Sequence, residues 1–392
     1  MNVPKIRFPK YTNNWDEIKL DRLYSFKNGI NGDRSLYGNG IKLISVSDIL
    51  NNNFITHDVI KGKININEKT LMENSVEYGD VLFQRSSETF LEIGSSNVYL
   101  DNKIVTYGGF VIRGKKLADN YNNPIFINYE LKSPSTRKKV ILGGAGSQHF
   151  NIGQEDLKKV SIFIPELNEQ NDIAEFMSLI DKKIELQSKK IEDLKLLKKG
   201  LLEKEFSKNY PEINLTKILK ERKLYSEKGL EYPHVTLSKD GIYDKSERYD
   251  RDFLVKSNDK QYKITRLNDL CYNPANLKFG VISLNEYGSA IFSPIYVTFE
   301  INKNANPLYI KYYTTRNNFI NAVRKYEQGT VYERMAVSSE DFLKFSIKLP
   351  SIEIQNKIVN KFELLDKKIK LEQFKLDKIN ALKKGLMQNM FV

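Results

Sequence analysis

Residues 165–206 read PELNEQNDIAEFMSLIDKKIELQSKKIEDLKLLKKGLLEKEF, and residues 350–391 read PSIEIQNKIVNKFELLDKKIKLEQFKLDKINALKKGLMQNMF. The two stretches align without a gap, so that Pro165 matches Pro350 at an offset of 185 positions. Both share a QN pair, a DKKI block and an LKKGL block in the same order. The segments before each stretch barely resemble each other. The chain therefore alternates variable and constant parts, as expected for two different domains on one duplicated framework.

Apolar residues recur in both stretches at alternating steps of four and three, which is the spacing of a coiled-coil seam. Each seam has a polar residue in the middle, Gln187 or Glu372, and a lysine near the end, Lys198 or Lys383, where we expect the preceding leucine to take over the contact. The predicted helix-helix seam consists of Ile173, Met177, Ile180, Ile184, Ile191, Leu194 and Leu201 in the first stretch, and Ile358, Phe362, Leu365, Ile369, Leu376, Ile379 and Leu386 in the second.

Each stretch is too long to be covered by one small domain, because about 40 helical residues span roughly 60 Å. The simplest partner for each helix is the other, and a two-fold-like arrangement of the duplicated halves makes the pair antiparallel. The alternative is that each helix docks only on its own domain. Ordinary surface helices are mostly about 8 to 20 residues long, which favours the paired arrangement.

The ends of the helices give the domain boundaries. Pro165 and Pro350 each follow a run of alternating apolar residues that predicts a strand, and proline ends such pairing. Gly200 and Gly385 lie late in the helices, where a close packing contact or a bend would explain a glycine. A short polar linker follows at 207–214. We predict a first globular domain at 1–164, a first long helix at 165–207, a second globular domain at 208–349 and a second long helix at 350–392.

The variable segments contain short strand-like runs, namely IKLISV, DVLFQR, GGFVIR and VSIFIP in the first, then ITRL, GVISL, PIYVTFEI and LKFSIKLP in the second. Helical stretches at 124–140 and 307–326 are mixed with them, which predicts compact α+β domains. Faint echoes link the two segments. Residues 79–82 resemble 268–271, residues 124–129 resemble 307–312, and a glycine-centred loop precedes the last strand of each segment, with Gly144 and Gly329 again 185 positions apart.

The composition limits the setting of the protein. A length of 392 residues supports two domains, and the net charge of +13 fits a nucleic-acid binder, although a mixture rich in Lys, Asn, Ile, Tyr and Phe also reflects codon bias. The single cysteine, Cys271, excludes an internal disulfide framework. No apolar run is long enough for a membrane span, and the three histidines have no metal-ligand spacing. We expect a cytoplasmic protein without a metal.

These residues together resemble a family, the specificity subunits of type I restriction-modification systems. The resemblance covers nearly the whole chain and is carried by Trp15 after a proline-containing lead and by the two repeats, with Glu169, Gln170, Ile173, Asp181 and Ile184, then Gln355, Ile358, Asp366 and Ile369. The chain departs from the pattern in two places. Ile354 stands where the first repeat has Glu169, and no tryptophan opens the second domain.

The resemblance implies a non-catalytic subunit in which two target-recognition domains each read one half of a split, asymmetric DNA sequence. The paired helices would separate two readers on one DNA face by about one helical turn, roughly 34–36 Å. The implied partners are double-stranded DNA, methyltransferase subunits that carry S-adenosylmethionine, and restriction subunits that use ATP and Mg. No cofactor is expected on this chain itself.

Base readout requires Arg, Lys, Asn, Gln or Ser on loops that can enter the major groove. Two loops in each domain meet this requirement, although a solvated loop residue explains any single member equally well. The DNA-binding candidates are Gln84, Arg85, Ser86, Ser147, Gln148 and His149 in the first domain, and Asn273, Asn276, Lys278, Thr330, Tyr332 and Arg334 in the second.

Two other classes of protein remain as alternatives. A stand-alone DNA methyltransferase or nuclease would need a target-base turn and a glycine-rich cofactor loop, and residues 272–276 (YNPAN) match such a turn poorly. The glycines at 143–146 lack the following Lys-Ser/Thr of a P-loop. The other alternative is a coiled-coil adaptor that binds only proteins, which salt-sensitive DNA binding would exclude.

Overall fold

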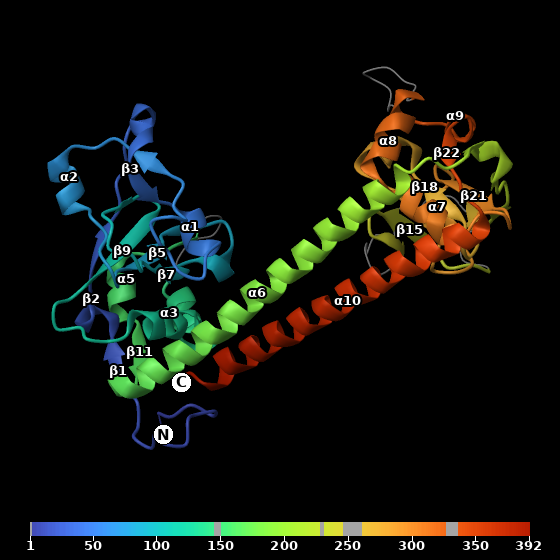
Figure 1. The fold of residues 1–392 in the computed structure, drawn as a ribbon. Helices are drawn as coiled ribbons and strands as arrows, with labels where there is room; N and C mark the ends of the chain where they lie inside the picture. The colour runs from blue at the N-terminus through green and yellow to red at the C-terminus, as the bar shows by residue number, and fades with distance from the viewer. Residues whose placement is uncertain (1, 145–149, 228–230, 246–260, 327–335) are drawn as a thin grey trace. The chain divides into compact units, whose positions relative to one another are not determined.

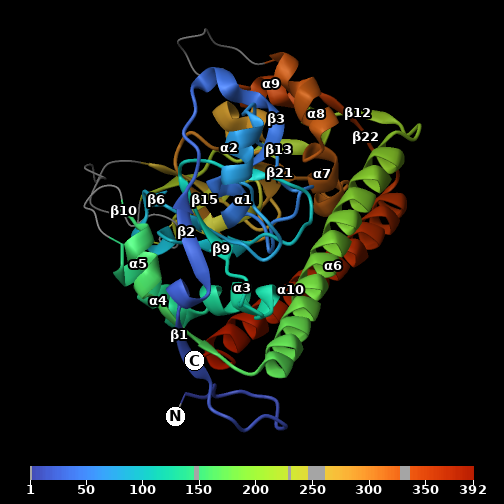
Figure 2. The same ribbon diagram turned by 90° about the vertical axis from the view of Figure 1, so that its left-hand side faces the viewer.

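The computed structural model describes residues 2–144, 150–227, 231–245, 261–326 and 336–392. The chain divides into two compact units. Unit 1 comprises residues 1–189 and 373–392, and unit 2 comprises residues 190–372. Each unit combines small, mostly antiparallel sheets with helices (Figures 1 and 2), so the predicted α+β class is confirmed. Within the described residues, no helix is long and apolar enough to cross a membrane.

The main sheet of unit 1 has four antiparallel strands in the order β2-β9-β5-β7. All four residues of β5 are buried, as expected for a central strand covered on both faces. The strands are β2 (Tyr24–Asn28), β9 (Val111–Lys116), β5 (Val81–Gln84) and β7 (Ser96–Val98). They confirm the strands predicted from DVLFQR and GGFVIR.

The smaller elements of unit 1 surround this sheet. The strand pairs are β1 (Asp16–Lys19) with β11 (Ser161–Ile164), β3 (Tyr37–Ile44) with β4 (Lys63–Ile64) and β8 (Thr106–Tyr107), and β6 (Ser86–Ser87) with β10 (Phe150–Asn151). The helices are α1 (Val46–Leu50), α2 (Glu68–Glu73), α3 (Pro124–Lys132), α4 (Pro134–Leu142) and α5 (Gln154–Lys159), with 3-10 turns η1 (Leu20–Arg22), η2 (Arg34–Leu36) and η3 (Phe90–Glu92).

The stretch predicted as helical at 124–140 consists of two helices. Asn123 caps the start of α3, where its side chain accepts hydrogen bonds from the Ile125 and Phe126 N–H groups. Ser133 ends α3 in an extended conformation and caps α4, whose first residue is Pro134. A proline disfavours helical geometry in the residue before it, which explains the break.

Unit 2 repeats the same main sheet, with four antiparallel strands in the order β13-β21-β18-β19. These strands are β13 (Leu219–Glu221), β21 (Val297–Ile301), β18 (Leu270–Tyr272) and β19 (Ile282–Leu284). The remaining strands are β12 (Glu212–Asn214) with β22 (Ser346–Lys348), β14 (Tyr225–Ser226) with β17 (Tyr262–Thr265) and β20 (Ala290–Phe292), and β15 (Val235–Ser238) with β16 (Gly241–Asp244). The helices are α7 (Pro307–Thr314), α8 (Asn317–Val323) and α9 (Ser339–Leu343), with 3-10 turns η4 (Leu215–Lys217), η6 (Pro274–Phe279) and η7 (Arg324–Tyr326).

The faint sequence echo between residues 79–82 and 268–271 marks the same turn in both units. Gly79 and Asn268 have positive φ angles of 88° and 68°. The Gly79 N–H donates to the Tyr99 carbonyl, and the Tyr99 N–H donates back to the Asp80 carbonyl. In unit 2, the Asn268 N–H donates to the Asn285 carbonyl, and the Asn285 N–H donates back to the Asp269 carbonyl. Glycine and asparagine are the residues that tolerate this left-handed conformation best, so two different sequences form one turn.

The two long helices are α6 (Leu167–Phe206) and α10 (Ile352–Asn389). Gln170 fixes the start of α6, because its side chain accepts from the Asn123 N–H at 2.9 Å and donates to the Pro165 carbonyl at 2.8 Å. Gln355 makes the same two bonds in unit 2, with the Asn306 N–H and the Pro350 carbonyl, both at 2.8 Å. The repeated glutamine therefore joins each long helix to the capped start of α3 or α7.

Each unit contains one part of α6 packed beside one part of α10 (Figures 1 and 2). In unit 1, Asp181 forms an ion pair with Lys383. In unit 2, Lys198 pairs with Asp366 at 2.5 Å and Lys190 pairs with Glu372 at 3.0 Å. None of the fourteen predicted seam residues is exposed. Every one of them therefore lies on a covered side of its helix.

Two expectations about the helices are wrong. Leu197 and Leu382 do not take over the seam contact near the lysines, because they are 51% and 56% exposed while Lys198 and Lys383 turn inward to aspartates. The close packing contact expected at Gly200 and Gly385 is also absent. An added Cβ would meet no atom within 4 Å at either glycine.

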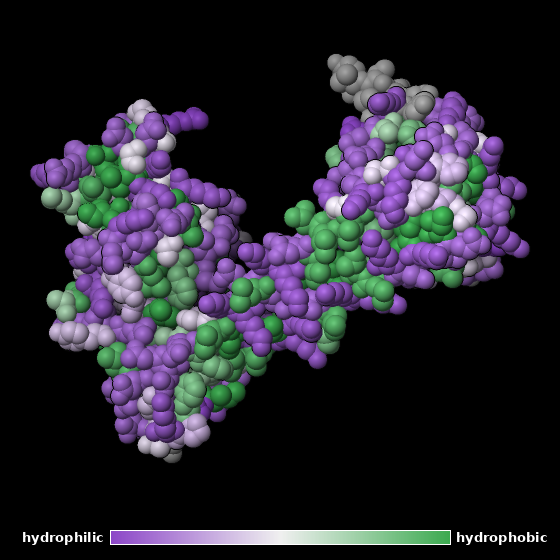
Figure 3. Space-filling model, viewed as in Figure 1, coloured by the Kyte–Doolittle hydropathy of each residue, from purple (hydrophilic) through white to green (hydrophobic). Residues whose placement is uncertain are grey.

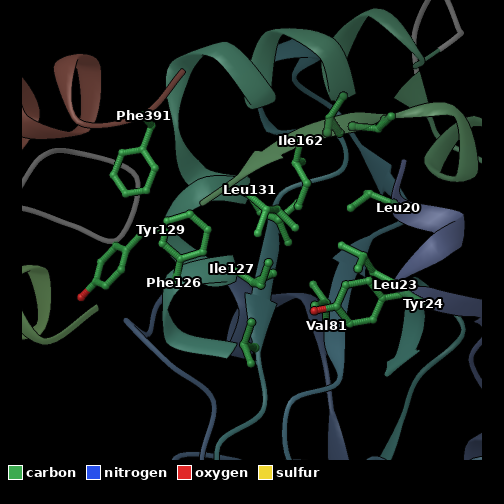
Figure 4. Close-up of a cluster of buried hydrophobic side chains, with 14 of the residues drawn as sticks. Leu20, Leu23, Tyr24, Val81, Phe126, Ile127, Tyr129, Leu131, Ile162 and Phe391 are labelled. Carbon is green, nitrogen blue, oxygen red and sulfur yellow. The ribbon is translucent and has the colours of Figure 1, made fainter. Parts of the chain in front are cut away.

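The core of each unit is completed by the end of a long helix. In unit 1, Phe391 after α10 lies beside Phe126 and Tyr129 of α3 (Figure 4), with 5.9 Å between the ring centroids of Phe126 and Phe391. In unit 2, Phe206 at the end of α6 packs on Tyr309 at 5.2 Å. Phe206 and Phe391 are matched residues of the sequence repeat, so the repeat positions one aromatic ring in each core.

Candidate functional site

The first predicted loop of unit 1 follows β5. Gln84 is only 4% exposed, and its side-chain amide donates to the Ser86 carbonyl at 2.9 Å. Its side chain therefore stabilises the turn from the inside, and a base contact by Gln84 would require the turn to open. Arg85 and Ser86 are half-buried and lie nearer the surface.

The strand that follows the second predicted loop of unit 1 lies beside the first loop. Ser147, Gln148 and His149 lie outside the described residues, but β10 follows them directly and pairs with β6, so that Asn151 lies opposite Ser86. The Ile152 N–H donates to the Arg85 carbonyl at 3.0 Å. The fold thus brings the 84–86 loop next to residues 150–152, which follow the second predicted loop in the sequence.

In unit 2, the loop after β18 is a capped 3-10 turn. The Asn273 side chain accepts from the Ala275 and Asn276 N–H groups at 3.1 and 3.2 Å, and Asn273 is 6% exposed. Its amide oxygen is therefore engaged in capping η6. Asn276 and Lys278 are exposed, and only these two of the three predicted residues present free side chains to the surface.

The residues that follow the second predicted loop of unit 2 make a matching bond to the first loop. Thr330, Tyr332 and Arg334 lie outside the described residues. The Val337 N–H, just after them, donates to the Pro274 carbonyl at 3.4 Å. Val337 follows Ile152 by 185 positions, the same offset as in the sequence repeat. Pro274 and Arg85 also correspond, because each lies four positions after the first residue of its strand, Leu270 of β18 or Val81 of β5. Both units therefore hold their two loops together in one way while the loops carry different side chains.

Exposed aromatic residues beside these loops escaped the sequence analysis. Phe110 is 69% exposed, and its carbonyl accepts the Arg85 N–H at 2.8 Å. Phe279 ends η6 and is 55% exposed, with the Lys278 ammonium 5.2 Å from its ring centroid. Apolar side chains at such positions contact thymine methyl groups or base steps in DNA complexes. The signal was weak because each is one phenylalanine in a chain with 21.

The described residues offer little for catalysis. Among them no group of three or more His, Cys, Asp or Glu side chains is arranged to hold a metal ion. Cys271 is fully buried, and burial raises the pKa of its thiol, which keeps it from acting as a nucleophile.

Comparisons with known proteins agree with this geometry. Residues 13–196 match the family model of the type I restriction modification DNA specificity domain. The fold is similar to a type I restriction-modification S subunit from M. genitalium, with 16% identity, a TM-score of 0.57 and coverage of 100% of this chain and 99% of that chain. It is also similar to a structure described as the basis of complex assembly and conformational transition of the type I R-M system, with 13% identity, a TM-score of 0.59 and coverage of 95% and 96%.

At these identities the structural likeness shows the fold, and the family match on residues 13–196 identifies the domain. Residues 13–196 are therefore a type I restriction modification DNA specificity domain, and the fold of the whole chain is similar to that of an S subunit of such a system. Such a subunit recognises DNA sequence and is neither the methyltransferase nor the nuclease.

Proposed function

We propose that the two recognition domains, at 1–164 and 208–349, each read one half of a bipartite, asymmetric DNA sequence. The observation that carries this proposal is the conserved framework under different loops. The bond from Ile152 to Arg85 and the bond from Val337 to Pro274 hold equivalent loop pairs, which present Arg85 and Ser86 in one unit and Asn276 and Lys278 in the other. Two readers with different contact residues select two different half-sites.

The long helices would set the distance between the half-sites as an intramolecular antiparallel coiled coil with pseudo-two-fold symmetry. Residue numbers fall along α10 as they rise along α6, since Asp181 pairs with Lys383 and Lys198 pairs with Asp366. The two ion pairs exchange equivalent residues of the repeat, which supports the two-fold relation. A stiff spacer of this kind gives a fixed unspecified gap in the target sequence.

Methyltransferase subunits would dock on the outer faces of the long helices. Three leucines on α6 are exposed there, and 18 residues, or five helical turns, separate the first from the last, so they share one face. They have exposed partners at the same offset on α10. The two sets are Leu179, Leu186 and Leu197 at 59%, 58% and 51% exposed, and Leu364, Leu371 and Leu382 at 67%, 53% and 56%. Figure 3 shows hydrophobic patches among hydrophilic residues along these helices.

Repeated apolar residues on an otherwise charged surface are typical of a protein-binding face. Because the face occurs on both helices, we propose one methyltransferase subunit on each. Those subunits would bring S-adenosylmethionine, and restriction subunits with ATP and Mg would join the larger complex. The proposed place of action is the cytoplasm, where the DNA target is found.

The test of the bipartite readout is to co-express the chain with its methyltransferase subunit and to map the methylated adenines. We expect a two-part motif with a fixed gap. Exchanging residues 1–164 for those of a relative should change one half of the motif, and exchanging residues 208–349 should change the other. A change in both halves after one exchange, or in neither, would contradict the proposal.

The test of the docking face uses Leu186→Asp with Leu371→Asp. We expect this pair of substitutions to abolish co-purification with the methyltransferase subunit while salt-dependent DNA binding by the free chain is kept. Lys195→Asp, at an exposed position of α6 outside the leucine face, is the matched charge-changing control. Unchanged association of the double variant would show that the partners bind elsewhere.

A further inference from the structure

Unit 1 contains a cavity of about 460 Å³ that none of the predicted DNA-contacting residues lines. It lies among α1, β7, α3, α4 and the two long helices. Pockets for small molecules hold about 300–1,000 Å³, so this cavity has room for a ligand larger than a simple ion. The charged residues described in its lining are Lys132, Arg137, Lys383 and Asp181.

The positive charge of this cavity exceeds its negative charge. Asp181 is already engaged, since it pairs with Lys383 and accepts a hydrogen bond from the Tyr129 hydroxyl at 2.8 Å. Lys132 donates only to the Asn53 carbonyl, at 3.0 Å, among the described residues. Burial lowers the pKa of Lys132 to about 8, and the neighbouring charge of Lys383 adds to the effect. An ammonium has three donors, so Lys132 can offer two more to an anion.

Arg137 adds a second uncompensated charge. Its guanidinium donates to the carbonyls of Gly94, Ile93 and Leu91 at 2.7, 2.8 and 3.1 Å. These bonds fix the position of the side chain but leave its positive charge without a carboxylate among the described residues. Its attraction for an anion is therefore electrostatic, and its donors are used for the wall of the cavity itself.

The cavity also has neutral polar groups. Asn128 is 1% exposed and donates from Nδ2 to the Asn53 carbonyl at 3.0 Å, while its Oδ1 is buried without a hydrogen-bond partner in the described structure. That oxygen is shielded from solvent, so it does not itself reach into the cavity. Ser96 lines the same wall and is 4% exposed.

We propose that this cavity binds a small phosphorylated molecule of roughly nucleotide size. Lys132 would donate to the phosphate, with Arg137 and Lys383 adding to the attraction, because lysine and arginine are the usual phosphate partners. The rest of the ligand would lie against the neutral polar residues of the lining, which include Asn52, Asn53 and Ser96. The proposal concerns a free small molecule and does not depend on the bipartite DNA readout.

Unit 2 has a matching cluster without this charge. Tyr312 donates to Asp366 as Tyr129 donates to Asp181. Counting from these tyrosines, Thr315 takes the place of Lys132 and Lys311 that of Asn128. Lys311 is itself paired with Glu286 at 2.5 Å. Substitution of Lys311 is therefore a matched control for substitution of Lys132.

The experiment is calorimetric titration of the full chain in buffer free of phosphate and sulfate, with adenosine 5′-monophosphate and ribose 5-phosphate as probes and adenosine as the uncharged match. We expect one site per chain for at least one phosphorylated probe and no measurable binding of adenosine. Lys132→Gln should weaken binding by about tenfold or more, as expected for loss of a charged phosphate contact. Lys311→Gln should leave the affinity unchanged.

A second variant guards against misfolding of Lys132→Gln. Leu50→Trp places a larger side chain at the cavity lining from a residue that is 42% exposed, and it should also abolish binding while all charges remain. The proposal is overturned if neither phosphorylated probe binds below about 1 mM, a standard free energy of about −4 kcal/mol. Equal binding of adenosine, unchanged affinity in both variants, or displacement of the probe by a short DNA duplex would overturn it as well.

Discussion

Unit 1 and unit 2 share a main sheet, its loops and a helix anchor, but they differ in what covers the start of the long helix. In unit 1 the N-terminal segment lies on α6, where Arg7 makes two hydrogen bonds of 2.7 Å with the buried Glu169, and Phe8 packs on Phe176 at 5.9 Å. At the offset of 185 positions, Glu169, Asp172 and Phe176 of α6 match Ile354, Lys357 and Lys361 of α10. All three residues of α10 are exposed.

This difference explains why Ile354 departs from the family pattern. Glu169 is an acid because it binds Arg7 of the N-terminal segment, whereas the matching Ile354 is exposed in the described structure. Gln170 and Gln355 stay identical because both bind backbone atoms. Side chains of the repeat are therefore kept where they bind the backbone framework and vary where they meet something outside the repeat.

The largest effect should come from the two aspartate clusters. Asp181 is 7% exposed at its side chain and Asp366 is 35% exposed. Asp181→Ala leaves Lys383 facing Lys132 in a poorly hydrated site and should lower the free energy of unfolding by about 4 kcal/mol, as for a broken buried ion pair. Asp366→Ala should cost about 1 kcal/mol, because water reaches Lys198 more easily. Urea unfolding followed by Trp15 fluorescence for the first, and by circular dichroism for both, measures the difference.

Trp15 is the single tryptophan and is buried in unit 1, so its fluorescence reports on that unit. Asp181→Asn is the control that keeps the side-chain shape and a hydrogen bond to Tyr129. Equal losses for Asp181→Ala and Asp366→Ala would show that burial does not distinguish the two clusters.

The next largest effect should be a pH dependence of the stability of unit 1 that unit 2 lacks. Burial raises the pKa of Glu130 from 4.5 to about 7. Glu130 follows Tyr129 directly, and the residue that follows the equivalent Tyr312 in unit 2 is Tyr313. The folded state holds this proton more tightly than the unfolded state. Protonated Glu130 therefore contributes its full share of stability below pH 4.5. As the pH rises through 7, this contribution is lost and the free energy of unfolding falls by about 3 kcal/mol.

Glu130→Gln should remove that dependence, because the amide stays neutral at every pH. The measurement is urea unfolding of both proteins by Trp15 fluorescence at pH values below 4.5 and above 7. Parallel pH profiles for the wild-type protein and the variant would mean that Glu130 is charged or hydrated in the folded state.

The N-terminal segment gives a smaller effect. Arg7→Ala should destabilise unit 1 by about 2 kcal/mol, since a buried carboxylate loses its charged hydrogen bonds. The cost stays below that for Asp181 because the segment can open and admit water. Adding Glu169→Ile, which copies the residue at Ile354, should restore most of the loss. If the double variant is as unstable as Arg7→Ala, the arginine is needed for more than this carboxylate.

The smallest effect is a gain. Gly200→Ala and Gly385→Ala should each raise the free energy of unfolding by about 1 kcal/mol, because alanine has the higher helix propensity and a Cβ meets no atom within 4 Å at either site. Thermal unfolding of each variant tests this. A loss at either glycine would show that an added Cβ is not accommodated in that helix.

Much of the architecture followed from local patterns. The helices predicted at 165–207 and 350–392 occupy Leu167–Phe206 and Ile352–Asn389, because heptad spacing and a leading proline are encoded within the stretch itself. The resemblance noted between residues 79–82 and 268–271 coincides with a turn that both units share. The division of the chain into two recognition domains and two spacers stays a prediction, as do the twelve DNA-contacting residues.

What the sequence did not reveal depends on distant partners. Arg7 and Glu169 are 162 positions apart, and the sequence around either residue does not indicate that the other is its partner. Lys198 and Lys383 looked like flaws in an apolar seam, since the aspartates that receive them come from the opposite helix. Gln84 and Asn273 have the polarity of base-reading residues, but local backbone groups engage them first.

The tyrosine of each aspartate cluster is the one member that lies outside the repeated stretches. Asp181 and Lys383, like Asp366 and Lys198, belong to the constant helices, whereas Tyr129 and Tyr312 belong to the variable domains. A domain exchanged at this position therefore has to supply this phenol group to complete the cluster, in addition to the N–H groups of Asn123 or Asn306 that donate to Gln170 or Gln355.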